Sequence, residues 1–107
     1  MPRLTAPPDR GALVVFTLSS ANAFKVRASF FRGLYGYDDK SQFGKYHYRR
    51  EGLLDRLGYV PLGRGVFIVR ADALAQVKRY MKGRAEMVWR TVVLTAKDRR
   101  LLAKPAR

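Results

Sequence analysis

Hydrophobic residues follow two different spacings in the first third of the chain. The run GALVVFTL, residues 11–18, is apolar throughout and rich in β-branched residues, which is typical of a strand buried on both faces. Over residues 21–35 the spacing becomes helical, and Val26, Phe30 and Leu34 share one apolar stripe. The pattern therefore predicts a strand followed by a helix.

The predicted first helix has a second apolar stripe and a polar side. Phe24, Phe31 and Tyr35 lie beside the first stripe, so they either complete the core or face a partner. Lys25 and Arg32 take the side of the helix that points away from both stripes. Gly33 and Gly36 weaken and then end the helix.

The remaining elements follow from the same criteria. The stretch YGYDDKSQFG, residues 35–44, consists of turn formers and is expected to be a loop. After it the sequence predicts a strand at 43–50, a strand at 59–70 whose core at 66–69 is entered through a Gly-Arg-Gly turn, a helix at 72–82 capped by Asp72, and a strand at 86–95.

The order β-α-β-β-α-β predicts an α+β fold of the ferredoxin-like kind, with four antiparallel strands and two helices on one face. The length of 107 residues suits one domain, which we place at residues 11–95. Residues 1–10 contain three prolines and are expected to form a flexible N-terminal arm. Residues 96–107 are expected to form a basic C-terminal tail without secondary structure.

The charge balance indicates an anionic partner. The chain has 22 Lys and Arg against 8 Asp and Glu, a formal net charge of +14, which exceeds what solubility requires. A polyanion would relieve the self-repulsion of such a chain, and nucleic acid is the polyanion favoured here. The hydrophobic fraction of 48% is still that of a folded domain.

Several classes of function are disfavoured by composition. The chain has no cysteine and one histidine, so neither a disulfide framework nor a zinc site is expected, and no cofactor or metal is predicted. The apolar run at 12–16 is too short for a signal peptide or a membrane span. We therefore expect a cytoplasmic protein without a membrane partner.

One cluster, SQFGKYHYRREG at residues 41–52, concentrates aromatic rings, cations and the single histidine. In strand alternation one side carries Lys45, His47 and Arg49, and the other carries Tyr46, Tyr48 and Arg50. If the tyrosines face outward on the free sheet face, they form a platform for stacking bases. If they face the core, the basic set meets phosphates instead.

The leading hypothesis is a noncatalytic RNA-binding protein, a ribosomal or ribosome-associated component that contacts rRNA phosphates and, with them, ribosomal proteins. The candidate RNA-binding residues are Lys45, Tyr46, His47, Tyr48, Arg49, Arg50, Arg64, Lys78, Arg79, Lys82, Lys97, Arg99 and Arg100.

Two alternatives remain open. A small metal-independent ribonuclease of the toxin kind would use His47 in acid-base chemistry, but the neighbours of His47 in a strand point away from it. Such a site would need Arg64, Arg70 or Tyr37 from elsewhere in the chain, so no enzyme is predicted. The other alternative is a DNA-binding architectural protein, because phosphates of RNA and DNA look alike to arginine.

In element order over residues 11–95 the chain resembles the small basic ferredoxin-like proteins associated with archaeal ribosomes and other archaeal RNA particles. This resemblance implies RNA binding without catalysis.

The size and element order are also similar to those of the CRISPR-associated Cas-two nucleases. That family ends its first strand with an aspartate, whereas VFTLSS has Thr17 and Ser19 here, so its metal nuclease site does not carry over. Resemblance to RelE-type messenger-RNA interferases is limited to a small basic body with scattered Tyr, Arg and His.

Overall fold

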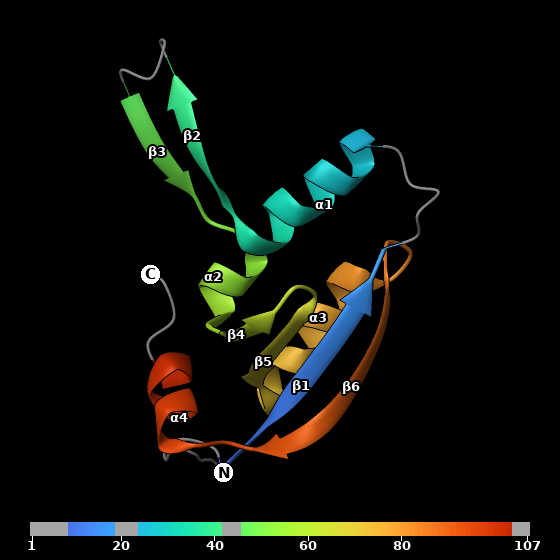
Figure 1. Ribbon diagram of the computed structural model, residues 1–107, viewed down its shortest axis with the longest axis vertical. Coiled ribbons are helices and arrows are strands. Elements are labelled where there is room, and N and C mark those ends of the chain that lie inside the picture. Colours follow the sequence, from blue (N-terminus) through green and yellow to red (C-terminus); the bar gives the residue numbers. More distant parts are fainter. Residues whose placement is uncertain (1–8, 19–23, 42–45, 104–107) are drawn as a thin grey trace.

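The computed structural model describes residues 9–18, 24–41 and 46–103 of the chain. Figure 1 shows their arrangement. The elements in chain order are β1 (Arg10–Thr17), α1 (Phe24–Tyr35), β2 (Tyr37–Ser41), β3 (Tyr46–Arg50), α2 (Leu53–Leu57), β4 (Val60–Gly63), β5 (Val66–Arg70), a 3-10 turn η1 (Ala71–Ala73), α3 (Leu74–Met81), β6 (Glu86–Val93) and α4 (Ala96–Ala103).

The main sheet is antiparallel and has four strands in the order β4-β5-β1-β6. The apolar run that predicted a strand buried on both faces is β1, which lies in the interior of this sheet. Leu13 marks its register, because it lies opposite Ile68 on β5 and opposite Arg90 on β6. The molecule is thus an α+β protein built on one antiparallel sheet.

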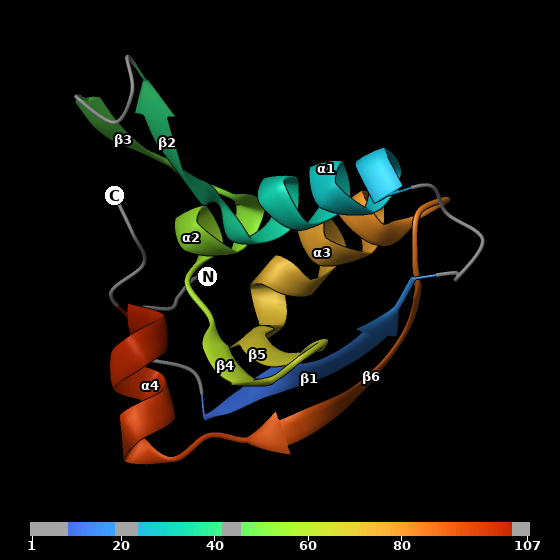
Figure 2. The ribbon, with the colours of Figure 1, turned by 45° about the horizontal axis from the view of Figure 1, so that its top comes forward.

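One face of the sheet carries the larger core beneath α1 and α3, as Figure 2 shows. Every second residue of β1 points to this face, and the side chains of Ala12, Val14 and Phe16 are buried there. They pack with Phe67 and Val69 of β5, Phe30 and Leu34 of α1, Leu54 of α2, and Leu74, Val77 and Met81 of α3. The Tyr80 hydroxyl donates a 2.8 Å hydrogen bond to the Phe30 carbonyl and so links α3 to α1.

The opposite face has a smaller apolar cluster covered at one end by α4. Leu102 of α4 is buried with Val60, Ile68 and Leu94. The expectation of an unstructured tail from residue 96 is therefore wrong, since residues 96–103 form a helix. Thr95 begins this helix, because its backbone N–H and hydroxyl exchange hydrogen bonds with the carboxylate and N–H of Asp98, both at 3.0 Å.

A second difference from the prediction concerns residues 37–41 and 46–50. They form a two-stranded sheet, β2 with β3, separate from the main sheet and projecting away from it beyond α1 and α2 in Figures 1 and 2. Residues 37–41 were expected to be a loop, and residues 43–50 a strand of the main sheet. Opposite charges explain the pairing, because Asp38 lies across from Arg49 and such cross-strand pairs stabilise a ladder.

The place expected for residues 43–50 in the main sheet is taken by β4, which pairs with β5 through a turn at Arg64 and Gly65. Gly65 has φ +72°, and a Cβ there would lie 2.8 Å from the Phe16 carbonyl oxygen. The strand core expected at 66–69 and the Gly-Arg-Gly turn before it are both present, but residues 60–63 before the turn form a strand of their own, so the region is a hairpin.

The two helices expected from periodicity are both present, but the side chains of Asp72 and Val26 lie differently from the prediction. α3 buries Leu74, Val77 and Met81 as the spacing predicts. Asp72, expected as its N-cap, instead bonds the Arg70 guanidinium at 3.0 Å. On α1, Val26 is 54% exposed instead of lying in the core stripe. No helix among the described residues is long and apolar enough to cross a membrane.

Candidate nucleic-acid interface

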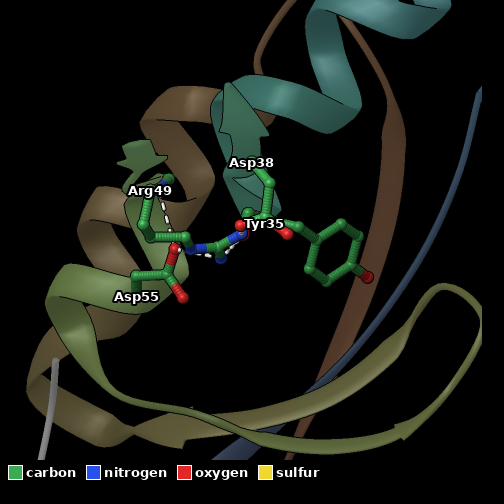
Figure 3. Close-up of polar contacts among 5 residues, drawn as sticks. Tyr35, Asp38, Arg49 and Asp55 are labelled. Carbon is green, nitrogen blue, oxygen red and sulfur yellow. Dashed lines mark hydrogen bonds and ion pairs between the residues drawn. The ribbon is translucent and has the colours of Figure 1, made fainter. Parts of the chain in front are cut away.

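The base of the β2–β3 hairpin is fixed by the side chain of Arg49, shown in Figure 3. Its Nη2 donates to the Asp55 carboxylate on α2 and to the Tyr35 carbonyl oxygen at the end of α1, both at 2.8 Å. Its Nη1 lies 3.8 Å from the Asp38 carboxylate. Arg49 thus contacts three elements, and its Nη2 makes two hydrogen bonds inside the molecule.

Two glycines allow this close approach of chain segments. Gly36 has φ +81°, and a Cβ there would lie 2.5 Å from both the Arg50 carbonyl oxygen and the Asp55 carboxylate. A Cβ on Gly52 would lie 2.3 Å from the Gly36 nitrogen. The Asp55 carboxylate also accepts the Gly52 N–H at 2.9 Å. The sequence can therefore place the hairpin against α2 only with glycine at both positions.

Other members of the cluster at 41–52 are placed as follows. Arg50 pairs with Asp39 at 3.0 Å and lies over the Tyr48 ring at 5.5 Å. Tyr48 is 49% exposed. Lys45 lies outside the described residues, and Tyr46 and His47 are placed on β3 by their backbone alone. Because β3 is outside the main sheet, neither sequence-based arrangement of these residues on that sheet applies.

The three candidate cations of the second helix region, Lys78, Arg79 and Lys82, are exposed. The Lys78 ammonium lies 4.9 Å from the centre of the Trp89 ring. The chain has no Asp or Glu between residues 73 and 85. These cations therefore form a positive surface at α3 without an acid in the same segment.

This positive surface continues onto α1, which also lacks acidic residues. Lys25 and Arg84 line a hollow of about 570 Å³ with Tyr80, and Arg84 lies 4.6 Å from the Tyr80 ring. A neighbouring hollow is lined by Lys25, Arg32 and Tyr37 and also by the acid Glu51, and Arg32 lies 4.9 Å from the Tyr37 ring. The two hollows share Lys25, so cations and rings alternate across this side of the molecule.

We call this surface the helix-face strip. It consists of the cations Lys25, Arg32, Lys78, Arg79, Lys82 and Arg84 and the rings of Tyr37, Tyr80 and Trp89. Burial raises the pKa of the Tyr80 phenol, although Arg84 lowers it in part, so Tyr80 remains a neutral hydrogen-bond donor to Phe30. Cations packed on aromatic rings are suited to phosphates with unpaired bases beside them.

The other candidate residues lie elsewhere. Arg64 is in the turn between β4 and β5. Lys97, Arg99 and Arg100 are on α4, which packs on the opposite face of the sheet from α1 and α3. The structure thus groups the α3 candidates on the helix-covered face of the sheet and places the α4 candidates against the opposite face.

Sequence reasoning did not select Lys25, Arg32, Arg84, Tyr37 or Trp89 as binding residues. A signal was present for the first two, because they are seven residues apart on the polar side of a helix. The ring contacts of the others depend on tertiary packing and leave no local pattern.

Comparisons with protein-family models, with curated proteins and with solved structures find no match for this chain. Within the described ranges, no three His, Asp or Glu side chains gather in a way that could hold a metal ion. The chemistry of the protein surface is therefore the basis for inferring its function.

Proposed function

We propose that this protein is a noncatalytic RNA-binding protein that holds RNA on the helix-face strip. The observation that carries the proposal is the alternation of exposed cations and aromatic rings over α1 and α3, two helices without an acidic residue. Phosphate neutralisation supplies the affinity of such a surface, and base stacking on the rings favours unpaired nucleotides.

The distribution of the acids supports the same surface. Asp38, Asp39 and Asp55 form ion pairs with Arg49 and Arg50 at the hairpin. These contacts compensate hairpin arginines, whereas the cations of α1 and α3 outnumber Glu51, the acid that lines the second hollow of the strip. The strip is therefore the primary contact in this proposal, and Arg49 has a structural role.

We further propose that the chain is a ferredoxin-like domain carrying an insertion. The main-sheet strands follow one another along the chain as β1, β4, β5 and β6, with α1 between the first two and α3 between the last two. This is the β-α-β-β-α-β order of that fold, and the hairpin with α2 is inserted after α1. Fold alone does not assign the function.

A ribosomal or ribosome-associated role in the cytoplasm is the particular form of the proposal. A charge of +14 spread over many segments suits a protein embedded among rRNA phosphates more than a regulator with one confined patch. Sedimentation of native cell extract tests this part, since comigration with a ribosomal subunit through a salt wash is expected. Recovery of the protein free of RNA at the top of the gradient would contradict it.

The strip itself is tested by binding. The full chain is titrated against a fluorescent RNA stem-loop and against a DNA duplex of the same length over a series of salt concentrations. The triple variant Lys78→Gln, Arg79→Gln, Lys82→Gln should bind RNA at least about tenfold more weakly, and its slope of log K against log salt should fall by about 2–3. The RNA should bind more tightly than the duplex, because its loop bases can stack.

The triple variant Lys97→Gln, Arg99→Gln, Arg100→Gln is the matched control. It removes the same number of charges from α4 on the opposite face. Equal loss in both triple variants would show a general charge effect and overturn the strip, and tighter binding to the duplex would favour DNA. Gel analysis of the RNA after incubation checks for cleavage, which would contradict a noncatalytic protein.

A further inference from the structure

The outer edge of β6 is an unprotected strand edge. β6 is eight residues long and ends the sheet, and it pairs with β1 from Glu86 to Val93 without a register shift. Figure 2 shows it along the rim of the molecule, and no described element pairs with its outer side. Its backbone N–H and C=O groups on that side have no strand partner among the described residues, although the Trp89 carbonyl oxygen accepts a 2.7 Å hydrogen bond from the Arg90 guanidinium.

The other edge of the same sheet is protected in the ways that natural proteins use. β4 has only four residues, contains Pro61, and has an irregular register between Pro61 and Gly63. α4 lies against β4 through the cluster of Val60 and Leu102. β6 has neither a proline nor a bulge, and its Val88 is 59% exposed. The contrast indicates that the β6 edge is kept open for a partner.

The pairing with β1 fixes which backbone groups of β6 point outward. The Leu94 N–H donates to the Asp9 carbonyl at 2.8 Å. In an antiparallel ladder every second residue bonds to the same neighbouring strand, so Val88 and Glu86, like Leu94, direct their N–H and C=O groups toward β1. Met87 and Trp89, between them, direct their N–H and C=O groups to the open edge.

We propose that β6 pairs antiparallel with β6 of a second copy of this chain, with the twofold axis at Val88. In this register Glu86 lies opposite Arg90 of the second copy, and Arg90 lies opposite its Glu86. Met87 and Trp89 face each other across the axis and exchange backbone hydrogen bonds, since both direct these groups outward. For this exchange the Arg90 guanidinium moves from the Trp89 carbonyl oxygen to Glu86 of the second copy. The two four-stranded sheets become one continuous sheet.

Charge and packing both favour this register. Two opposite-charge pairs flank the axis, whereas an axis at Arg90 would place the two arginines against each other. Val88 lies opposite Val88 of the second copy. This pair extends the cross-strand row of Val66, Val15 and Val88 across both sheets. The Met87 thioether meets the indole of Trp89, a favourable contact of sulfur with an aromatic ring.

Sedimentation equilibrium of the full chain at physiological ionic strength tests the proposal. A dimer of twice the 12.2 kDa chain mass is expected at rising concentration. Glu86→Arg and Arg90→Glu should each raise the dimer dissociation constant by about tenfold or more, because each replaces two attractive pairs by two repulsive ones. The double variant with both substitutions should return it to within about threefold of the wild type.

Controls separate pairing from net charge and from folding. Glu51→Arg and Arg100→Glu make the same charge changes at exposed positions off β6, and they should leave the dissociation constant within about threefold. Circular dichroism of each variant checks that the monomer is folded. A wild-type chain that stays monomeric would overturn the proposal, as would single swaps without effect or a double swap that does not restore association.

Discussion

Arg49 on β3 and Asp55 on α2 lie 2.8 Å apart, and this ion pair joins the projecting hairpin to the body of the protein. The Asp55 side chain is only 16% exposed and also accepts the Gly52 N–H. A hairpin of two strands is marginally stable alone, so its position depends on such contacts at its base.

Asp55→Ala should therefore lower the free energy of unfolding by about 1–3 kcal/mol, because it leaves the Gly52 N–H and the Arg49 guanidinium without their acceptor. Urea denaturation measures the change. Asp38→Ala is the control, since Asp38 is 72% exposed and 3.8 Å from Arg49, and a change below about 0.5 kcal/mol is expected. Equal effects of the two substitutions would contradict the structural role of Asp55.

The glycine at the hairpin base has a larger expected effect. Gly36→Ala should destabilise by about 2 kcal/mol or more, because φ +81° is unfavourable for alanine and the Cβ meets the Arg50 carbonyl oxygen and Asp55. Gly83→Ala should cost about 1 kcal/mol, since φ is +76° but the space is open. Gly63→Ala has neither problem and should be nearly neutral in the same denaturation assay.

α4 should depend on one buried leucine. Leu102→Ala is expected to cost about 2–3 kcal/mol, because Leu102 is 2% exposed against Val60 and Ile68. Its neighbour Leu101 is 42% exposed, and Leu101→Ala should change stability by less than about 0.5 kcal/mol. Thermal unfolding of the two variants checks the difference, and similar melting temperatures would count against α4 being docked.

Stability should decline at alkaline pH through the tyrosines of the core. Burial raises the pKa of Tyr35, Tyr59 and Tyr80, so each phenol holds its proton more tightly in the folded state than at its ordinary pKa of about 10. The folded state then binds more protons than the unfolded state, and stability falls as pH rises. The stabilisation from these three phenols is fully present below about pH 10, their pKa in the unfolded chain. It is lost as the pH rises through their raised pKa values in the folded state.

Urea denaturation between about pH 8 and pH 11 measures this decline. Tyr59→Phe removes one titrating group and should give a shallower decline than the wild type. An equal slope in the wild type and Tyr59→Phe would contradict the contribution of Tyr59.

The parts of the fold that the sequence predicted are those set by side-chain period and burial. β1 and α3 were predicted because their apolar residues follow the spacing of a strand and a helix, and the same residues are buried. β2 was missed because Asp38 and Asp39 are typical of a turn, and their pairing with arginines appears only when β3 lies alongside.

α4 was missed although a local signal existed. Thr95 and Asp98 have the spacing of a capping box, which marks the start of a helix, but the density of cations after them was interpreted as a disordered tail. Of the candidate site, the α3 cations were identified from sequence. The structural use of Arg49 could not be predicted, because it depends on Asp55 and the Tyr35 carbonyl meeting in space.

The pairing of β1 with β6 also constrains how the chain folds during its synthesis. Arg10 lies opposite Val93, so of the four strands of the main sheet the interior strand β1 is made first and its neighbour β6 is made last. Contacts between residues so far apart close slowly, because a long loop must be ordered before they form. The nascent chain therefore exposes the apolar β1 until β5 and β6 have left the ribosome, and a chaperone that binds short apolar segments would meet it during this interval.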